Sequence, residues 1–154
     1  MDTAAPGYSH TQKAPCLFVY GTALLLLIGA WFTQDQPTVA LALTVGGIVT
    51  AVLATAFHHL TVVNLGEAMS VRFGPLPMFR MTIPYNDITS VEVGRTLILD
   101  GWGIHYSVRG GWVWNVWGRD CVVVHRRNGV VRIGTDDAPN LARFLEGKIA
   151  EQRG

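Results

Sequence analysis

Charged residues are scarce in this sequence. Asp, Glu, Lys and Arg make up 15% of its 154 residues, whereas soluble proteins contain about 25%. The shortage is uneven, because no charged residue occurs between Ala14 and Gln34 or between Gln36 and Phe57. The net charge of +1 is also too small to indicate the dense basic patch that is typical of nucleic-acid-binding domains. The sequence therefore predicts no nucleic-acid partner.

Cysteine is also rare. Cys16 lies at the edge of the first uncharged segment, and Cys121 lies in a predicted strand far along the chain. A disulfide between them would have to join these two dissimilar regions. We therefore predict two reduced thiols and a reducing compartment.

Two uncharged segments predict a pair of membrane helices at about residues 15–33 and 38–59. Each is long enough to cross a hydrocarbon core of ~30 Å. Between them stands Gln34-Asp35-Gln36-Pro37, and its proline is tolerated at a helix start. A second segment so soon after the first favours an uncleaved hairpin over a signal peptide. We therefore predict an N-terminal tail (1–13) and a transmembrane hairpin (14–59).

Basic residues near the segment ends predict the orientation of this hairpin. Lys13 precedes the first segment, Arg72 and Arg80 follow the second, and the turn carries only Asp35. By the positive-inside rule, both termini are expected in the cytoplasm. The prediction is a multi-pass protein of the cell membrane (inner or plasma membrane), with the lipid bilayer as a partner.

Three residues are predicted to anchor the hairpin at membrane interfaces. Trp31 lies near the end of the first segment, and His58 and His59 close the second. Tryptophan and polar imidazole groups both suit the headgroup region. Paired histidines could also bind a metal, but no Cys and only one carboxylate, Glu67, lies within ten residues, so no metal site is predicted.

Small residues recur every four positions in the second segment, a pattern that lets helix backbones approach closely in lipid. Packing against the first helix of the same hairpin is favoured over a seam between two copies, and self-association stays an alternative. The two stripes are Gly47, Ala51, Thr55 and Gly46, Thr50, Ala54.

From residue 60 onward the pattern has period two. Met69, Val71 and Phe73 alternate with Ser70 and Arg72, as in a half-buried strand. Similar runs follow, and Asn128-Gly129 indicates a tight β-hairpin turn. Near the C-terminus, an apolar stripe with helical spacing predicts a helix at about 137–151. We therefore predict a domain (60–154) of about seven antiparallel strands, bent into a barrel and capped by that helix.

The residues of this domain resemble a known family: small bacterial membrane proteins in which a pleckstrin-homology-like (PH-like) domain follows a transmembrane hairpin. The resemblance covers about residues 60–150 and implies a PH-like barrel at a membrane surface. One departure is His105, where members often carry an Arg. The landmarks are Val71-Arg72-Phe73-Gly74-Pro75, Ile83-Pro84 with Ile88, Gly101-Trp102-Gly103-Ile104, and the run from Gly129 to Asp137.

Aromatic and basic residues of this domain predict an interaction surface. Trp112 and Trp114 share one face of a predicted strand and Trp117 lies on the other, so all three cannot be buried. An exposed indole often marks a partner surface. Arg126 and Arg127 precede the predicted turn and could face an anionic leaflet, although a solvated hairpin tip is favoured.

No catalytic or cofactor-binding residue is predicted. Side chains capable of acid, base or nucleophilic chemistry have no recognised spacing; these are Asp100, His105, Asp120, Cys121 and His125. The sequence therefore predicts a non-enzymatic, membrane-anchored PH-like interaction or scaffold module with an unknown protein partner. The alternatives are a lipid-related or accessory role in a larger membrane complex and, less favoured, an uncharacterised enzyme.

Overall fold

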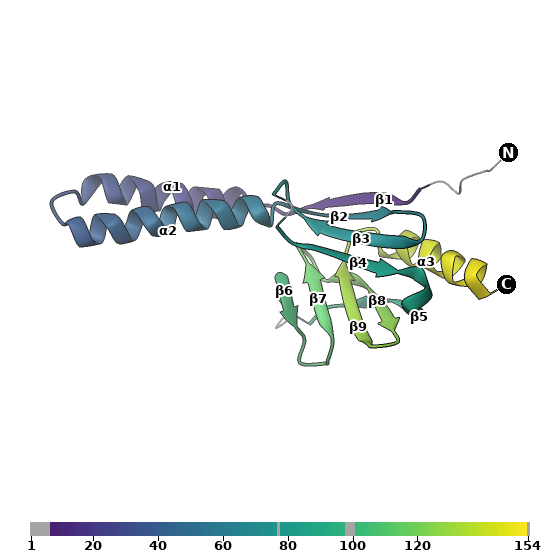
Figure 1. Cartoon of the computed structure of the whole chain (residues 1–154). Coiled ribbons are helices and arrows are strands. Elements are labelled where there is room, and N and C mark those ends of the chain that lie inside the picture. The colour runs from purple at the N-terminus through teal and green to yellow at the C-terminus, as the bar shows by residue number, and fades with distance from the viewer. Residues whose placement is uncertain (1–6, 77, 98–100, 154) are drawn as a thin grey trace.

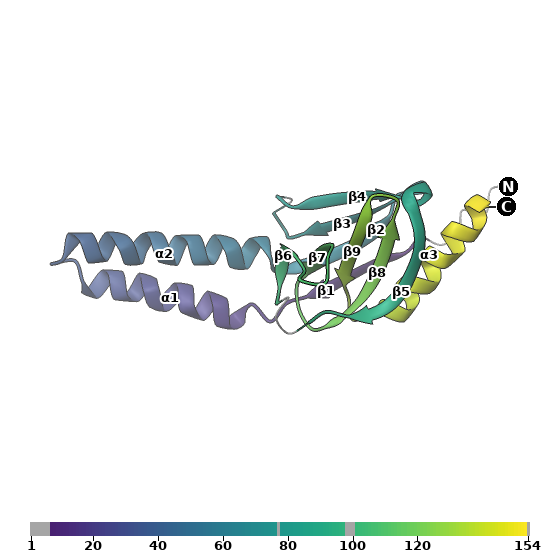
Figure 2. The same cartoon turned by 90° about the horizontal axis from the view of Figure 1, so that it is seen from below.

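The computed structural model describes residues 7–76, 78–97 and 101–153. A helical hairpin projects from one end of a β-rich body (Figure 1). The third helix lies at the opposite end of that body, as Figures 1 and 2 both show. The molecule therefore has a long apolar extension on one side only.

The hairpin consists of α1 (Leu17–Phe32) and α2 (Pro37–Ala56). Both helices are rich in Ala and Leu, which favour helix. Pro37 occupies the first turn of α2, where its missing N–H would have no partner within the helix anyway. The two helices pack side by side in both views (Figures 1 and 2).

The hairpin connects two neighbouring strands, β1 (Ser9–Lys13) and β2 (His59–Asn64). These strands are antiparallel, with Lys13 opposite His59. The Ala14 amide donates to the His58 carbonyl at 2.9 Å, which continues the ladder toward the helices. The whole hairpin is thus the connection between two adjacent strands. β1 is not predicted from the sequence.

The first sheet has four strands in the order β1-β2-β3-β4, all antiparallel. Its remaining strands are β3 (Ala68–Phe73) and β4 (Arg80–Pro84).

A short 3-10 helix, η1 (Tyr85–Asp87), then leads to the second sheet. Tyr85 is buried and donates to Asn64 Oδ1 at 2.8 Å, and burial raises the pKa of Tyr85 to about 12. η1 is therefore locked onto the end of β2.

The second sheet has five strands in the order β5-β8-β9-β7-β6. β7 and β9 are parallel, and the other pairs are antiparallel. The predicted Asn128-Gly129 turn joins β8 to β9 with Gly129 at a positive φ. The strands are β5 (Ile88–Arg95), β6 (Gly103–Tyr106), β7 (Trp112–Asn115), β8 (Asp120–Arg126) and β9 (Gly129–Gly134).

The core lies between the two sheets and beneath α3 (Ala138–Arg153), which packs on β5 and β8. Leu141 and Leu145 of α3 are fully buried there, together with Phe73 of β3 and Ile133 of β9. Tyr8, which precedes β1, donates to Asp137 at 3.1 Å. Burial and the Asp137 charge raise the pKa of Tyr8. The start of α3 is thus tied to the strand that leads into the hairpin.

The predicted PH-like barrel is wrong. The described strands form two separate sheets of four and five strands, which do not close on each other. Pro84 ends β4, and η1 turns the chain before β5 begins, so β4 and β5 do not pair. The parallel pairing of β7 with β9 is a further departure from a simple antiparallel barrel.

The predicted transmembrane hairpin is also wrong. Within the described residues, only α2, with 20 residues, is long and apolar enough to cross a membrane. α1 has 16 residues and is about 24 Å long at 1.5 Å per residue, less than the ~30 Å of a hydrocarbon core. The ladder between β1 and β2 holds the chain up to Ala14, so the helix starts later than predicted. A multi-pass membrane protein with both termini in the cytoplasm is therefore not supported.

Candidate functional site

The surface of the helical hairpin is apolar around most of its circumference. Little of α2 is buried against the rest of the chain. The core of this chain lies elsewhere, and an exposed apolar surface of this size marks contact with a membrane or with a partner. The most exposed of these side chains include Leu17, Phe18, Leu24, Leu25, Trp31, Phe32, Leu41, Val45, Ile48, Val49 and Leu53.

Four threonine hydroxyl groups of the two helices find their hydrogen-bond partners within the hairpin. Thr44 and Thr50 donate to backbone carbonyls one turn earlier, at 2.8 Å and 2.7 Å. Thr22 and Thr55 do the same at 3.0 Å and 2.9 Å. The Tyr20 hydroxyl lies 3.1 Å from the Thr55 hydroxyl. Internal partners of this kind are what an environment without water demands.

The stripe of small residues on α2 packs against α1 of the same chain. A Cβ atom on Gly47 would lie 2.8 Å from the Leu27 side chain and 3.2 Å from the Ala23 carbonyl, so a larger residue there would displace Leu27. Gly46 and Gly29 also face leucines of the opposite helix. The structure thus uses the stripe for packing within the hairpin, and self-association stays a prediction.

Phe57 fixes the base of the hairpin to the first sheet. Its ring lies 4.9 Å from the Phe73 ring and 5.3 Å from the Phe79 ring, measured between centroids. Phe73 also contacts Trp114 of the second sheet at 5.6 Å. A series of contacts between aromatic rings therefore links the hairpin to both sheets.

The predicted interface anchors lie at opposite ends of the hairpin. Trp31 is 72% exposed near the turn, whereas His58 and His59 lie at the base, with their Nδ1 atoms 3.4 Å apart. Burial lowers the pKa of His59, and nearby His58, Arg72 and Lys13 lower it further, so its neutral form is favoured. No cluster of three metal-ligating side chains occurs among the described residues. The interfacial role of the three anchors stays a prediction.

Two tryptophans form a stacked pair beside the hairpin base. The rings of Trp102 and Trp117 lie 4.4 Å apart with an interplanar angle of 28°, and both are exposed, at 60% and 40%. Trp117 was a predicted surface residue, although it follows β7 instead of lying within it. Trp102 was not predicted for this surface, because its contact with Trp117 joins two loops that a single sequence does not bring together.

Asn115 holds the two loops that carry this tryptophan pair. Its side chain is fully buried. Asn115 Nδ2 donates to the Gly101 carbonyl at 3.4 Å and to the Gly118 carbonyl at 2.9 Å. Asn115 Oδ1 accepts from the Trp117 amide at 3.2 Å. A Cβ atom on Gly134 would lie 2.1 Å from that Oδ1 atom, so glycine at 134 leaves the space that Asn115 occupies.

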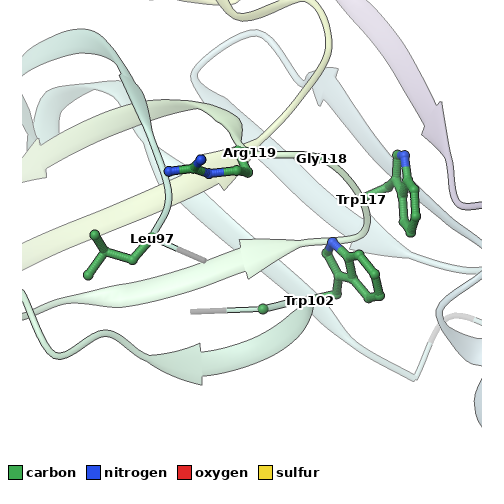
Figure 3. A pocket seen from close by; sticks show the side chains of 6 residues that line it. Leu97, Trp102, Trp117, Gly118 and Arg119 are labelled. Atoms are coloured by element: carbon green, nitrogen blue, oxygen red, sulfur yellow. The ribbon is translucent and has the colours of Figure 1, made fainter. Parts of the chain in front are cut away.

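A cavity lies on each side of the tryptophan pair. One, of about 450 Å³, lies between Trp102 and Trp117 on one side and Leu97 and Arg119 on the other (Figure 3). The second, of about 330 Å³, lies where the hairpin meets the body, and we call it the junction cavity. Its walls include Phe18, Val19, Leu53, Trp102, Val116 and Trp117.

The other predicted tryptophans lie apart from this pair. Trp114 is half-buried against Phe73, whereas Trp112 is 51% exposed and packs edge-on against Tyr106 at 5.9 Å. Tyr106 and Trp112 border a third cavity, of about 360 Å³, together with Arg109. The predicted tryptophan surface is therefore two separate surfaces.

The predicted basic tip consists of one engaged and one exposed arginine. Arg126 Nε donates to Asp87 Oδ2 at 2.7 Å, which ties β8 to η1. Arg127 is exposed at the turn before Asn128. Only Arg127 therefore resembles a solvated tip.

The side chains weighed for catalysis do not come together in a recognisable constellation among the described residues. Asp120 pairs with Arg95 at 3.1 Å, and His125 pairs with Glu92 at 3.1 Å. Cys121 is fully buried, and it forms no disulfide with Cys16. Asp100 lies outside the described residues. The absence of an enzymatic activity stays a prediction.

Comparison with known proteins adds no family or relative. No family model, curated protein or solved structure matches the chain. The resemblance to PH-like membrane proteins therefore stays a prediction, and the function has to be argued from the residues themselves.

Proposed function

We propose that this protein is a lipid-attached interaction module without catalytic activity. Its helical hairpin embeds apolar side chains in a bilayer, and the two sheets stand at the lipid surface. The observation that carries this proposal is the combination of an uncharged, exposed helical surface with a separate core for the β-rich body. Exposed apolar surface of this extent marks contact with a membrane or a partner.

Lipid is favoured over a protein partner because the apolar surface surrounds both helices. A protein partner usually covers one face of a helix and leaves the opposite face polar. Leu25 of α1 and Val49 of α2 are 69% and 50% exposed, and four threonine hydroxyls of the helices have partners within the hairpin. Hydrocarbon requires both features.

The module's partner surface is proposed at the exposed pair of Tyr106 and Trp112. The two rings border a cavity that Arg109 also lines. Aromatic residues and arginine are the side chains most enriched at binding hot spots. A protein or peptide that binds there would be held at the lipid surface by the hairpin.

Flotation with vesicles tests the lipid attachment. The full chain, synthesised in the presence of neutral phosphatidylcholine vesicles, is expected to float with them on a density gradient. Because the contact is apolar, it should survive high salt and alkaline carbonate. Release by either treatment would show a peripheral, electrostatic contact and would contradict the proposal.

A further inference from the structure

The junction cavity is apolar and opens beside the surface that we assign to lipid. It is bordered by Phe18 and Val19 of α1, by Leu53 of α2, and by Phe57, which directly follows α2. Its volume of about 330 Å³ falls within the range of roughly 300–1,000 Å³ that is typical of pockets for small ligands. Phe18 and Leu53 are themselves exposed, so the cavity is continuous with the apolar hairpin surface. A hydrocarbon chain matches this lining.

The neighbouring cavity supplies a cation next to this apolar space. Trp102 and Trp117 line both cavities, so the stacked pair is a shared wall. Arg119 lies across the cavity of about 450 Å³ from this pair (Figure 3). Arg119 Nε donates to the Thr96 carbonyl at 3.3 Å. Among the described residues, no carboxylate lies within ion-pair distance of Arg119.

The remaining guanidinium N–H groups of Arg119 are suited to an anion. Arginine carries five N–H donors, and among the described residues the Arg119 guanidinium makes one hydrogen bond, through Nε. The nearest acidic residue in the sequence, Asp120, already pairs with Arg95 at 3.1 Å. A carboxylate or phosphate group would complement this charge with strong, charge-assisted hydrogen bonds.

We propose that the two cavities form one binding site for a single anionic lipid. Its hydrocarbon chain occupies the junction cavity, and its headgroup meets Arg119 beyond the tryptophan pair. This inference rests on the proposed function in one respect, the source of the ligand. An embedded hairpin would bring the cavity to the level of bilayer lipids. The buried Asn115 bonds to both loops that carry the pair.

Quenching of tryptophan fluorescence by a dibrominated fatty acid tests the site. The full chain in neutral detergent micelles is expected to show saturable quenching, because bromine on a bound chain would contact Trp102 and Trp117. Val19→Phe fills the cavity and should weaken the apparent affinity at least about tenfold. Val49→Phe is the matched control, because Val49 is similarly exposed on the hairpin but lies outside the cavity.

A second pair of variants tests the headgroup contact. Arg119→Gln should weaken fatty-acid binding about tenfold, the loss expected for one charge-assisted contact. It should leave binding of the neutral dibrominated alcohol of the same chain length unchanged. Arg127→Gln, at the exposed β8–β9 turn, should change neither. Equal binding of acid and alcohol by the unmodified chain would overturn the assignment of Arg119.

The outcomes separate this inference from the proposed function. Quenching that does not saturate, or that Val19→Phe leaves unchanged, would overturn the lipid site even if the chain floats with vesicles. Saturable binding by a chain that fails to float would support the site and contradict the lipid attachment.

Discussion

Arginine at both position 25 and position 49 is expected to release the protein from neutral vesicles. Leu25 and Val49 lie near the middle of α1 and α2 and are exposed. The exposed Leu, Ile, Val and Phe side chains of both helices supply the apolar contact with lipid. Moving an Arg side chain into hydrocarbon costs roughly 2.5–3.5 kcal/mol, so one Arg in each helix should weaken that contact strongly. The fraction of Leu25→Arg/Val49→Arg protein that floats should fall at least about tenfold.

Val108→Arg is the control for this experiment. Val108 is 82% exposed, and it lies in the loop between β6 and β7, outside the hairpin. The same apolar-to-charged change should leave flotation intact. Thermal unfolding of the body should be similar for all variants, because none of the three side chains belongs to the core. Flotation of the double variant at the level of the unmodified chain would contradict the lipid contact of the hairpin.

Phe73→Ala is expected to destabilise the body by roughly 3–5 kcal/mol, the usual cost of deleting a buried Phe ring. Phe73 is 1% exposed and contacts Phe57 at the hairpin base and Trp114 of the second sheet. The substitution would therefore leave a cavity where three parts of the molecule meet. Urea unfolding followed by near-ultraviolet circular dichroism in a mild detergent measures the change.

Phe18→Ala provides the comparison, because Phe18 is 83% exposed. This substitution should leave the unfolding midpoint of the body nearly unchanged. A loss below about 1 kcal/mol for Phe73→Ala would be less than a buried aromatic ring normally contributes. That result would contradict the assignment of Phe73 to the core that couples hairpin and sheets.

Local patterns in the sequence predict many of the elements. The alternation of Met69, Val71 and Phe73 matches β3, and Asn128-Gly129 forms the turn between β8 and β9. The apolar stripe near the C-terminus corresponds to α3, which buries Leu141 and Leu145. In each case neighbouring residues in the chain carry the information.

Features that depend on distant partners are not predictable in this way. β1 exists because residues 9–13 pair with residues 59–63 across the hairpin, and that pairing also shortens α1. The parallel pairing of β7 with β9 and the separation into two sheets likewise arise from long-range contacts. A periodicity of two identifies a strand but not its neighbour, so the predicted barrel was wrong.

In the candidate site, too, some features follow from local sequence and others depend on contacts between distant residues. Placing the tryptophans on opposite faces of one strand predicts that some are exposed, and Trp112 of β7 is exposed. Trp117 is exposed as well, but it follows β7 and does not lie on that strand. The stacking of Trp102 on Trp117 depends on the bonds that Asn115 makes to both loops. Nothing in the local sequence indicates that Asn115 is buried between them.

Spin-label accessibility in vesicles tests most directly whether the hairpin lies in hydrocarbon. A label at Leu25→Cys, in a chain with Cys16 and Cys121 replaced by Ala, is compared with a label at Val108→Cys. We predict frequent collisions with oxygen and rare collisions with a water-soluble nickel complex at position 25, and the reverse at position 108. A water-like response at position 25 would contradict this account.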